Sequence, residues 1–177
     1  MRAKTSKLAA LVVALAAAGS VLAANDDATF AVTANIASQC VVGNTTAMAF
    51  GDLAMLNLAS GGLSTAKNNA TATFDTTCTN GTGAPTLKFA SANGGGTAFK
   101  MRGGSGSDTI TYTLYEGATD AGTSIAHDTL AAYTGFAADG TVKSLSVTGQ
   151  VAAADKNGKP IGAYSDTVTI TVGFTPD

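Results

Sequence analysis

The chain has 177 residues, of which 45% are hydrophobic and only 12% are charged. Its 12 Asp and Glu outnumber its 10 Lys and Arg, so it lacks the surplus of cations that binding to nucleic-acid phosphates requires. A surface made mainly of neutral Thr, Ala, Gly, Ser and Asn is unusual for a cytosolic enzyme. It suits an exported protein that packs against copies of itself.

Residues 1–24 have the order of a secretory signal peptide. Basic residues precede an apolar run at 8–18, and small residues follow it. A membrane-spanning helix needs about 20 apolar residues, and no run in the sequence approaches that length, so we expect no transmembrane segment. Cleavage after Ala23 and cleavage after Ala24 fit equally well. The mature chain of about 153 residues is long enough for one domain.

The mature chain begins with a well-patterned stretch at residues 28–36. Apolar and polar residues alternate along it, which predicts a half-buried strand. A second strand is predicted at 38–42, and no Gly, Pro or Asn-Gly turn separates the two runs. They therefore form one long strand, or the first run leaves the domain. The apolar side of the first run consists of Ala28, Phe30, Val32, Ala34 and Ile36.

The two cysteines, Cys40 and Cys78, would lie in an oxidising compartment after export. A single disulfide is the default expectation there. Closing a loop of about 39 residues would stabilise the fold by roughly 3–4 kcal/mol. A metal site lacks further ligands, because the chain has one histidine, His127, and no cluster of ligands surrounds either cysteine. We expect no metal and no other cofactor.

Period-2 patterning predicts further strands at residues 70–78, 86–90, 109–115, 142–151 and 164–174. Turns rich in Gly, Asn, Ser and Asp separate them, and residues 125–132 fit either a short helix or a loop. Strands at this spacing, without helices between them, predict a single β-sandwich. The last run ends just before the C-terminus, so no strand follows it. Its apolar side includes Val168, Ile170, Val172 and Phe174.

No constellation that would carry catalysis is visible in the sequence. A serine hydrolase needs a base, and His127 lies in a segment that is typical of a solvated loop. Glu116 and Asp120 fall in a turn between strands, where solvation explains them better than general acid–base catalysis. We therefore expect no catalytic residues and no enzyme activity.

A sandwich that ends without a final strand exposes both a strand edge and an apolar groove. Residues 28–36 of a neighbouring copy would close the groove by donor-strand complementation, in which one chain adds a strand to the sheet of another. The competing interpretation is that residues 28–36 form an edge strand within their own chain.

Several short motifs resemble one protein family over nearly the whole mature chain. They are the alternating run before Cys40, Phe-Gly-Asp-Leu at 50–53, Thr-Thr-Cys at 76–78, the run at 110–115, Val-Thr-Gly-Gln-Val at 147–151 and Gly-Ala-Tyr-Ser-Asp-Thr-Val at 162–168. The last motif is the most specific, because this family usually ends on such a strand. By these motifs the chain resembles the spore coat protein U domain family, which includes the major pilins of archaic chaperone–usher pili.

The resemblance implies an all-β, incomplete immunoglobulin-like β-sandwich at residues 38–177, which lacks its final strand and is held by a Cys40–Cys78 disulfide. Residues 25–37 would form an N-terminal donor-strand extension that inserts its apolar side chains. The acceptor groove would be bordered by the apolar side of 164–174. A periplasmic chaperone would lend the missing strand, and an outer-membrane usher would exchange it for the extension of an identical or related pilin subunit.

The resemblance also implies a function. The chain would be a structural subunit of an extracellular pilus, exported through the periplasm to the cell surface, that supports adhesion and biofilm formation. Two alternatives are a surface-binding adhesin module and a protective spore or cell coat protein. A tip adhesin normally carries an additional receptor-binding domain, and the mature chain has no room for one and no Trp for a sugar-stacking platform.

Overall fold

The structure is a computed structural model that describes residues 28–103 and 106–175. The chain divides into two units, Met1–Asn35 and Ile36–Asp177. The expected signal peptide at 1–24 lies outside the described residues. Among the described residues, no helix is long and apolar enough to cross a membrane.

Residues 28–35, the described part of the first unit, form no strand, and their side chains are exposed. Phe30 is 86% exposed and Val32 is 82% exposed. The prediction of a half-buried strand at 28–36 is therefore wrong for the chain by itself, and these residues do not extend the strand that begins at Cys40. The physical reason is that a strand needs a neighbour to satisfy its backbone donors and acceptors, and alternation alone does not supply one.

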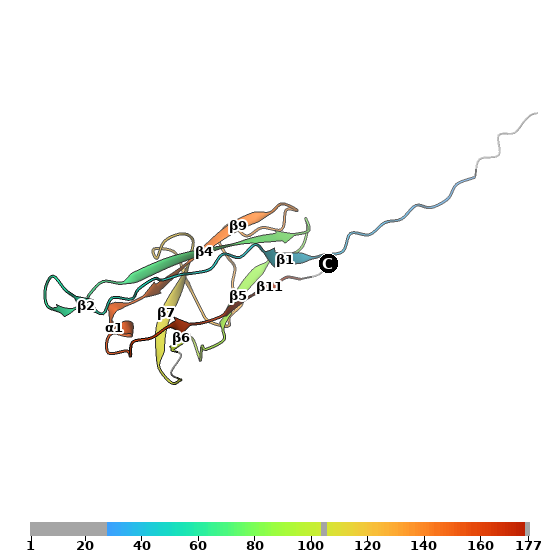
Figure 1. The fold of residues 1–177 in the computed structure, drawn as a ribbon. Helices are drawn as coiled ribbons and strands as arrows, with labels where there is room; N and C mark the ends of the chain where they lie inside the picture. Colours follow the sequence, from blue (N-terminus) through green and yellow to red (C-terminus); the bar gives the residue numbers. More distant parts are fainter. Residues whose placement is uncertain (1–27, 104–105, 176–177) are drawn as a thin grey trace, which may run out of the picture. The chain divides into compact units, whose positions relative to one another are not determined.

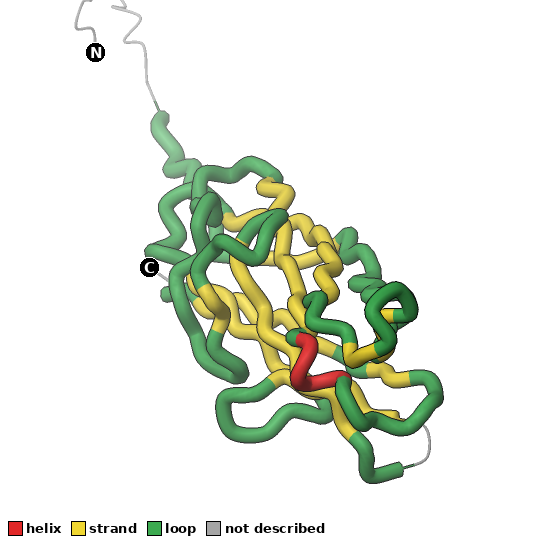
Figure 2. The backbone as a smooth tube through the Cα atoms, turned by 90° about the vertical axis from the view of Figure 1, so that its left-hand side faces the viewer, coloured by secondary structure: helices red, strands yellow, loops and turns green. Residues whose placement is uncertain are grey.

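The second unit is built from antiparallel strands (Figures 1 and 2). Its largest sheet has the order β1 (Cys40–Gly43), β4 (Asn68–Cys78), β9 (Lys143–Val151), β7 (Thr109–Glu116), β6 (Phe99–Gly103) and β10 (Tyr164–Ser165), and β8 (Ser124–Ile125) pairs with β7. Two smaller sheets pair β5 (Thr86–Ser91) with β11 (Val168–Gly173), and β2 (Leu56–Asn57) with β3 (Gly62–Leu63). The described residues contain one short helix, α1 (Ala153–Lys156). The all-β prediction is confirmed.

The core lies between the large sheet and the β5–β11 pair. Phe74 of β4 and Phe89 of β5 are each 1% exposed, and their ring centroids lie 5.8 Å apart. Tyr133, from the loop before β9, packs 6.0 Å from the ring of Phe74. Along β4 the predicted inward side is confirmed, because Ala70, Phe74 and Cys78 are buried. The alternation that predicted these strands is thus the alternation between core and surface.

The strands predicted at 38–42, 70–78, 86–90, 109–115 and 142–151 are confirmed, with small shifts at their ends. Residues 126–132 form a loop, which settles the choice between helix and loop. Strand β6 was not predicted, because Lys100 and Arg102 sit between its buried residues in a glycine-rich region. The run at 164–174, predicted as one strand, is two strands, β10 and β11, which pair with different partners.

Candidate functional site

An open groove lies between two parts of the second unit that no strand joins. Among the strands of residues 28–103 and 106–175, β11 pairs only with β5 and β1 pairs only with β4, so each has one free edge there. Between them is a hollow of about 600 Å³. Its walls include Val42 of β1 and Phe50 from the strandless segment after β1 on one side, with Val168 and Ile170 of β11 on the other. This is where a sandwich lacking its last strand would be open.

The β11 wall keeps the alternation that the sequence predicts. Val168, Ile170 and Val172 are half-buried, whereas Thr169 and Thr171 are exposed. The apolar side chains of an edge strand therefore point inward but remain partly uncovered. Val168 and Ile170 line the groove, while Phe174 lies beyond the end of β11 and is half-buried. Their role as the border of an acceptor site stays a prediction.

The opposite wall depends on Gly149 of β9. A Cβ atom at this position would lie 2.4 Å from the Sδ atom of Met48 and 2.7 Å from the ring of Phe50. Both distances are far inside van der Waals contact, so a side chain at position 149 would force Met48 and Phe50 to move away from β9. Phe50 in turn meets the ring of Tyr112 edge-on, with centroids 5.9 Å apart. The glycine of the Val-Thr-Gly-Gln-Val motif thus shapes the groove.

Asp166 lies in the groove lining, at the point where the C-terminal run changes partner. Its carboxylate accepts hydrogen bonds from Ser91 Oγ at 2.5 Å and from the Tyr112 hydroxyl at 2.6 Å. It also accepts from the backbone N of Asn93 at 3.2 Å and from Asn93 Nδ2 at 3.0 Å. These bonds pin the chain between β10 and β11, which explains why one alternating run becomes two strands. Burial raises the pKa of Tyr112, and the Asp166 carboxylate raises it further.

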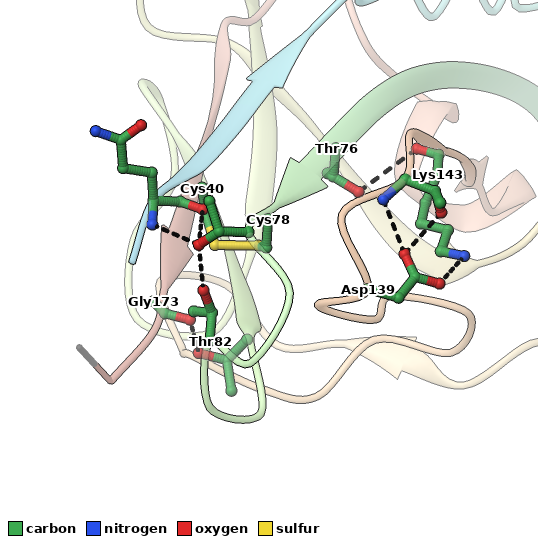
Figure 3. The surroundings of a disulfide bond; sticks show 11 residues. Cys40, Thr76, Cys78, Thr82, Asp139, Lys143 and Gly173 are labelled. Atoms are coloured by element: carbon green, nitrogen blue, oxygen red, sulfur yellow. Dashed lines mark hydrogen bonds and ion pairs between the residues drawn. A yellow bond between two sulfur atoms is a disulfide. The ribbon is translucent and has the colours of Figure 1, made fainter. Parts of the chain in front are cut away.

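The β1 wall is fixed to β4 by the expected disulfide, since Cys40 and Cys78 are bonded and lie directly opposite each other in the two strands (Figure 3). Just before β1 begins, the backbone N of Thr79 donates to the Gln39 carbonyl at 2.9 Å, and the backbone N of Gln39 donates to Thr79 Oγ1 at 3.0 Å. Further along, the Thr46 hydroxyl accepts a 2.7 Å bond from the backbone N of Thr73. The wall therefore has a rigid base at the disulfide.

The residues that the sequence left as weak catalytic candidates serve structural contacts. His127 is half-buried rather than solvated, and its ring packs edge-on against Phe99 with centroids 5.1 Å apart. The Asp120 carboxylate accepts bonds from Lys67 and from Gln150, and the Lys67 bond is the main reason why its pKa falls to about 2. No group of three or more metal-ligating side chains occurs in the described part of the chain.

Sequence reasoning missed two parts of this groove. Met48 and Phe50 lie in a segment without regular secondary structure, where no periodicity marks them; Phe50 stood out only as part of the Phe-Gly-Asp-Leu motif, with no role in a groove assigned to it. Asp166 interrupts an otherwise apolar–threonine alternation, and that interruption was the available signal for a break in the strand.

The sequence matches one family model. This model, described as the Spore Coat Protein U domain, matches residues 26–171. No curated protein sequence matches the chain.

Among solved structures, the CsuC–CsuE chaperone–tip adhesion subunit complex of archaic chaperone-usher Csu pili of Acinetobacter baumannii is similar, with a TM-score of 0.48 and 17% identity, over 77% of this chain and 40% of that one. The P pilus rod subunit PapA has a TM-score of 0.47 and 17% identity, over 84% of this chain and 100% of that one. A chaperone–tip adhesin complex of CFA/I fimbriae has a TM-score of 0.42 and 13% identity, over 62% and 35%. The chain therefore spans less than half of the matched chains in the two complexes.

Proposed function

The chain belongs to the Spore Coat Protein U domain family, and from this premise we propose that it is a structural subunit of a fibre outside the cell. In this fibre, residues 28–36 of one copy occupy the open groove of the next copy and supply its missing strand. The subunit acts as a building block and not as an enzyme.

One observation carries the proposal: the same chain holds an exposed, strand-patterned segment and a groove between two free strand edges. Residues 28–35 form no strand in the structure, and no strand in the described part of the chain pairs with the second edge of β11. Nine residues in extended conformation cover about 30 Å. Strand β11, with six residues, is only roughly 20 Å long. The remaining residues of the 28–36 segment would extend past β11 along the part of the groove near Tyr164.

The energetics favour such a joint. Burial of a Phe, Val or Ile side chain contributes about 1.5–3 kcal/mol, and Phe30, Val32 and Ile36 are all at least 82% exposed before insertion. Backbone hydrogen bonds to the free edge of β11 add direction and register. A joint with both contributions dissociates slowly, so the fibre is kinetically stable.

Partners follow from the open groove. An uncovered apolar groove favours aggregation, so a subunit in transit needs a temporary cover. A periplasmic chaperone supplies it by lending a strand, and an outer-membrane usher exchanges that strand for residues 28–36 of an identical or related subunit. The finished fibre lies at the cell surface, where it supports adhesion and biofilm formation.

The description of the family favours a second candidate, a protective coat protein. A coat would use the same joint and would differ only in where the polymer is deposited. Electron microscopy of the producing cells distinguishes the two, because a pilus extends from the cell as a filament and a coat forms a layer.

The test compares two substitutions in the extension, Val32→Asp on its apolar side and Thr33→Asp on its polar side. Val32→Asp is expected to abolish the ladder of polymers that survives SDS without boiling, because a charge would enter the apolar groove. Thr33→Asp is expected to keep the ladder. Both residues lie in a segment that forms no strand and is exposed. Circular dichroism and disulfide formation should therefore be unchanged in both variants.

A ladder that persists in Val32→Asp, or in a chain without residues 28–36, contradicts the proposal. A complementary measurement adds a synthetic peptide of residues 28–36 to the chain that lacks them. The peptide is expected to raise the melting temperature, and a peptide with aspartate at position 32 is expected to have no effect.

A further inference from the structure

Five of the exposed large apolar residues of the second unit form two groups, one near each end of β4. One group lies on the β2–β3 hairpin: Leu56 is 60% exposed, Leu58 90% and Leu63 58%. Leu56 and Leu63 are direct partners across the hairpin, and we call Leu56, Leu58 and Leu63 the leucine hairpin. It precedes the Asn68 end of β4, and Figure 1 shows it at the opposite end of β4 from β1.

A second group lies beside the disulfide. Val41 is 63% exposed and pairs with Thr77 of β4. Val142 is 64% exposed and comes one position before Lys143, which pairs with Thr76. Val41 lies opposite Thr77, and continuing the β4–β9 register by one residue beyond Lys143 places Val142 on the other side of Thr77, on the same face of the sheet. We call Val41, Thr77 and Val142 the valine row.

The two groups cannot meet within one domain. Strand β4 has 11 residues and spans about 36 Å, with the leucine hairpin before its start and the valine row near its end. Single exposed apolar residues are normal on a protein surface. Here, however, the proposed joint between copies brings these two ends together.

The direction of the joint follows from strand pairing. Strand β11 runs toward the disulfide end of the domain, because Gly173 pairs with Thr86 and a Cβ atom on Gly83, five residues after Cys78, would lie 3.5 Å from Thr175. Antiparallel pairing is somewhat more stable than parallel pairing. A donor antiparallel to β11 places residue 28 near Gly173 and residue 36 near Tyr164. Tyr164 also lines a second hollow, together with Met55, the residue directly before β2.

The connection between the donor segment and its own domain is short. Only residues 37–39 separate Ile36 from Cys40, so the two Cα atoms lie at most about 14 Å apart. The disulfide end of the donating copy must therefore sit next to the hairpin end of the receiving copy. This holds the valine row within reach of the leucine hairpin.

We propose that the leucine hairpin of each receiving copy packs against the valine row of the copy that donates its strand. This contact rests on the proposed function, and it adds a second interface that limits rotation about the three-residue connection. The partner of the leucine hairpin is a second copy of this chain. Residues 37–39 hold the valine row of the donating copy next to every hairpin in the fibre except the last.

The test places the photo-cross-linking amino acid p-benzoylphenylalanine at position 58 and, as a control, at position 97, an exposed residue of the turn between β5 and β6. Leu58 is 90% exposed, so its replacement does not threaten folding. After irradiation of assembled fibres, mass spectrometry is expected to find position 58 joined to peptides that contain residue 41 or 142. The same adduct is expected to be at least tenfold weaker from position 97.

The outcomes separate the two proposals. If the SDS-resistant ladder forms but position 58 gives no adduct, or joins a different protein or another region of the neighbouring copy, the hairpin contact is wrong and the donor-strand joint stands. If the unmodified chain forms no ladder, the donor-strand joint fails and the hairpin contact fails with it. A Val142→Asp variant that keeps the ladder and loses the adduct supports the contact.

Discussion

Asp166 determines where one alternating run changes its strand partner. Its carboxylate gathers donors from three residues, Ser91, Asn93 and Tyr112. A carboxylate that receives several hydrogen bonds has a strong preference for one position. The neighbouring Tyr164 packs closely against Gly103 of β6. A Cβ atom on Gly103 would lie 2.9 Å from the Tyr164 ring, so this contact also fixes the position of the chain before β11. The Gly-x-Tyr-x-Asp-Thr-Val motif thus describes a strand break.

Tyr112→Phe removes one donor from Asp166 and is expected to destabilise the fold by about 1–3 kcal/mol at pH 7. The pKa of Tyr112 is raised in the folded state, first by burial and then by its bond to Asp166. The unfolded chain therefore loses this proton more readily, and stability falls as the pH rises above about 10. Denaturant unfolding between pH 7 and 11 is expected to show a flatter decline in the variant. Tyr115→Phe, which alters a half-buried tyrosine outside this network, serves as the control.

Gly149→Ala is expected to push Met48 and Phe50 away from β9, since the added Cβ would lie 2.4 Å from Met48 Sδ. Overpacking of this kind costs about 1–3 kcal/mol. The variant should therefore melt at a lower temperature and bind the 28–36 peptide more weakly. Gly43→Ala is the matched control, because a Cβ at position 43 meets nothing within 4 Å. Equal behaviour of the two variants would show that close approach at Gly149 does not shape the groove.

At the scale of elements, the two walls of the groove differ in how they are held. Strand β11 pairs along its whole length with β5, from Val168 opposite Ser91 to Gly173 opposite Thr86. Strand β1 has four residues, and the segment after it has no regular secondary structure and bonds to β4 through Thr46 and Thr73. The disulfide compensates at the base of this wall. We therefore expect loss of the disulfide to destabilise the β1 wall more than the β11 wall.

Replacement of both cysteines by serine is expected to lower the free energy of unfolding by roughly 3–4 kcal/mol, because the cross-link joins residues 38 positions apart. Hydrogen exchange is expected to rise in β1 more than in β11, since the disulfide is attached to β1 at Cys40, whereas β11 is held by its six-residue pairing with β5. Reduction of the wild-type protein provides the control without a change in sequence. Uniform exchange across both strands would contradict this account.

At the scale of the whole molecule, the domain is an assembly of strands with one place left open. In the proposed joint, the apolar alternation of residues 28–36 matches the apolar lining of the groove. Predictions at this scale concern polymers: loss of the SDS-resistant ladder in Val32→Asp, and the adduct between the leucine hairpin and the valine row. Both predictions are measured by assembly of the chain: the first by whether a polymer forms, the second by cross-linking within the polymer.

The sequence alone determined the local features. Alternation marked most of the strands and their inward faces, as at Phe74 and Ile170, because side-chain direction along a strand depends only on the parity of position. The two cysteines of an exported chain predicted one disulfide, which the structure contains. Only the tertiary structure decided which distant residues pack and hydrogen-bond with one another. The break at Asp166 needs Ser91, which is 75 positions away, and the packing of Met48 needs Gly149 on a different strand. Such contacts between distant residues leave no period in the sequence, so they could be found only once the chain was folded.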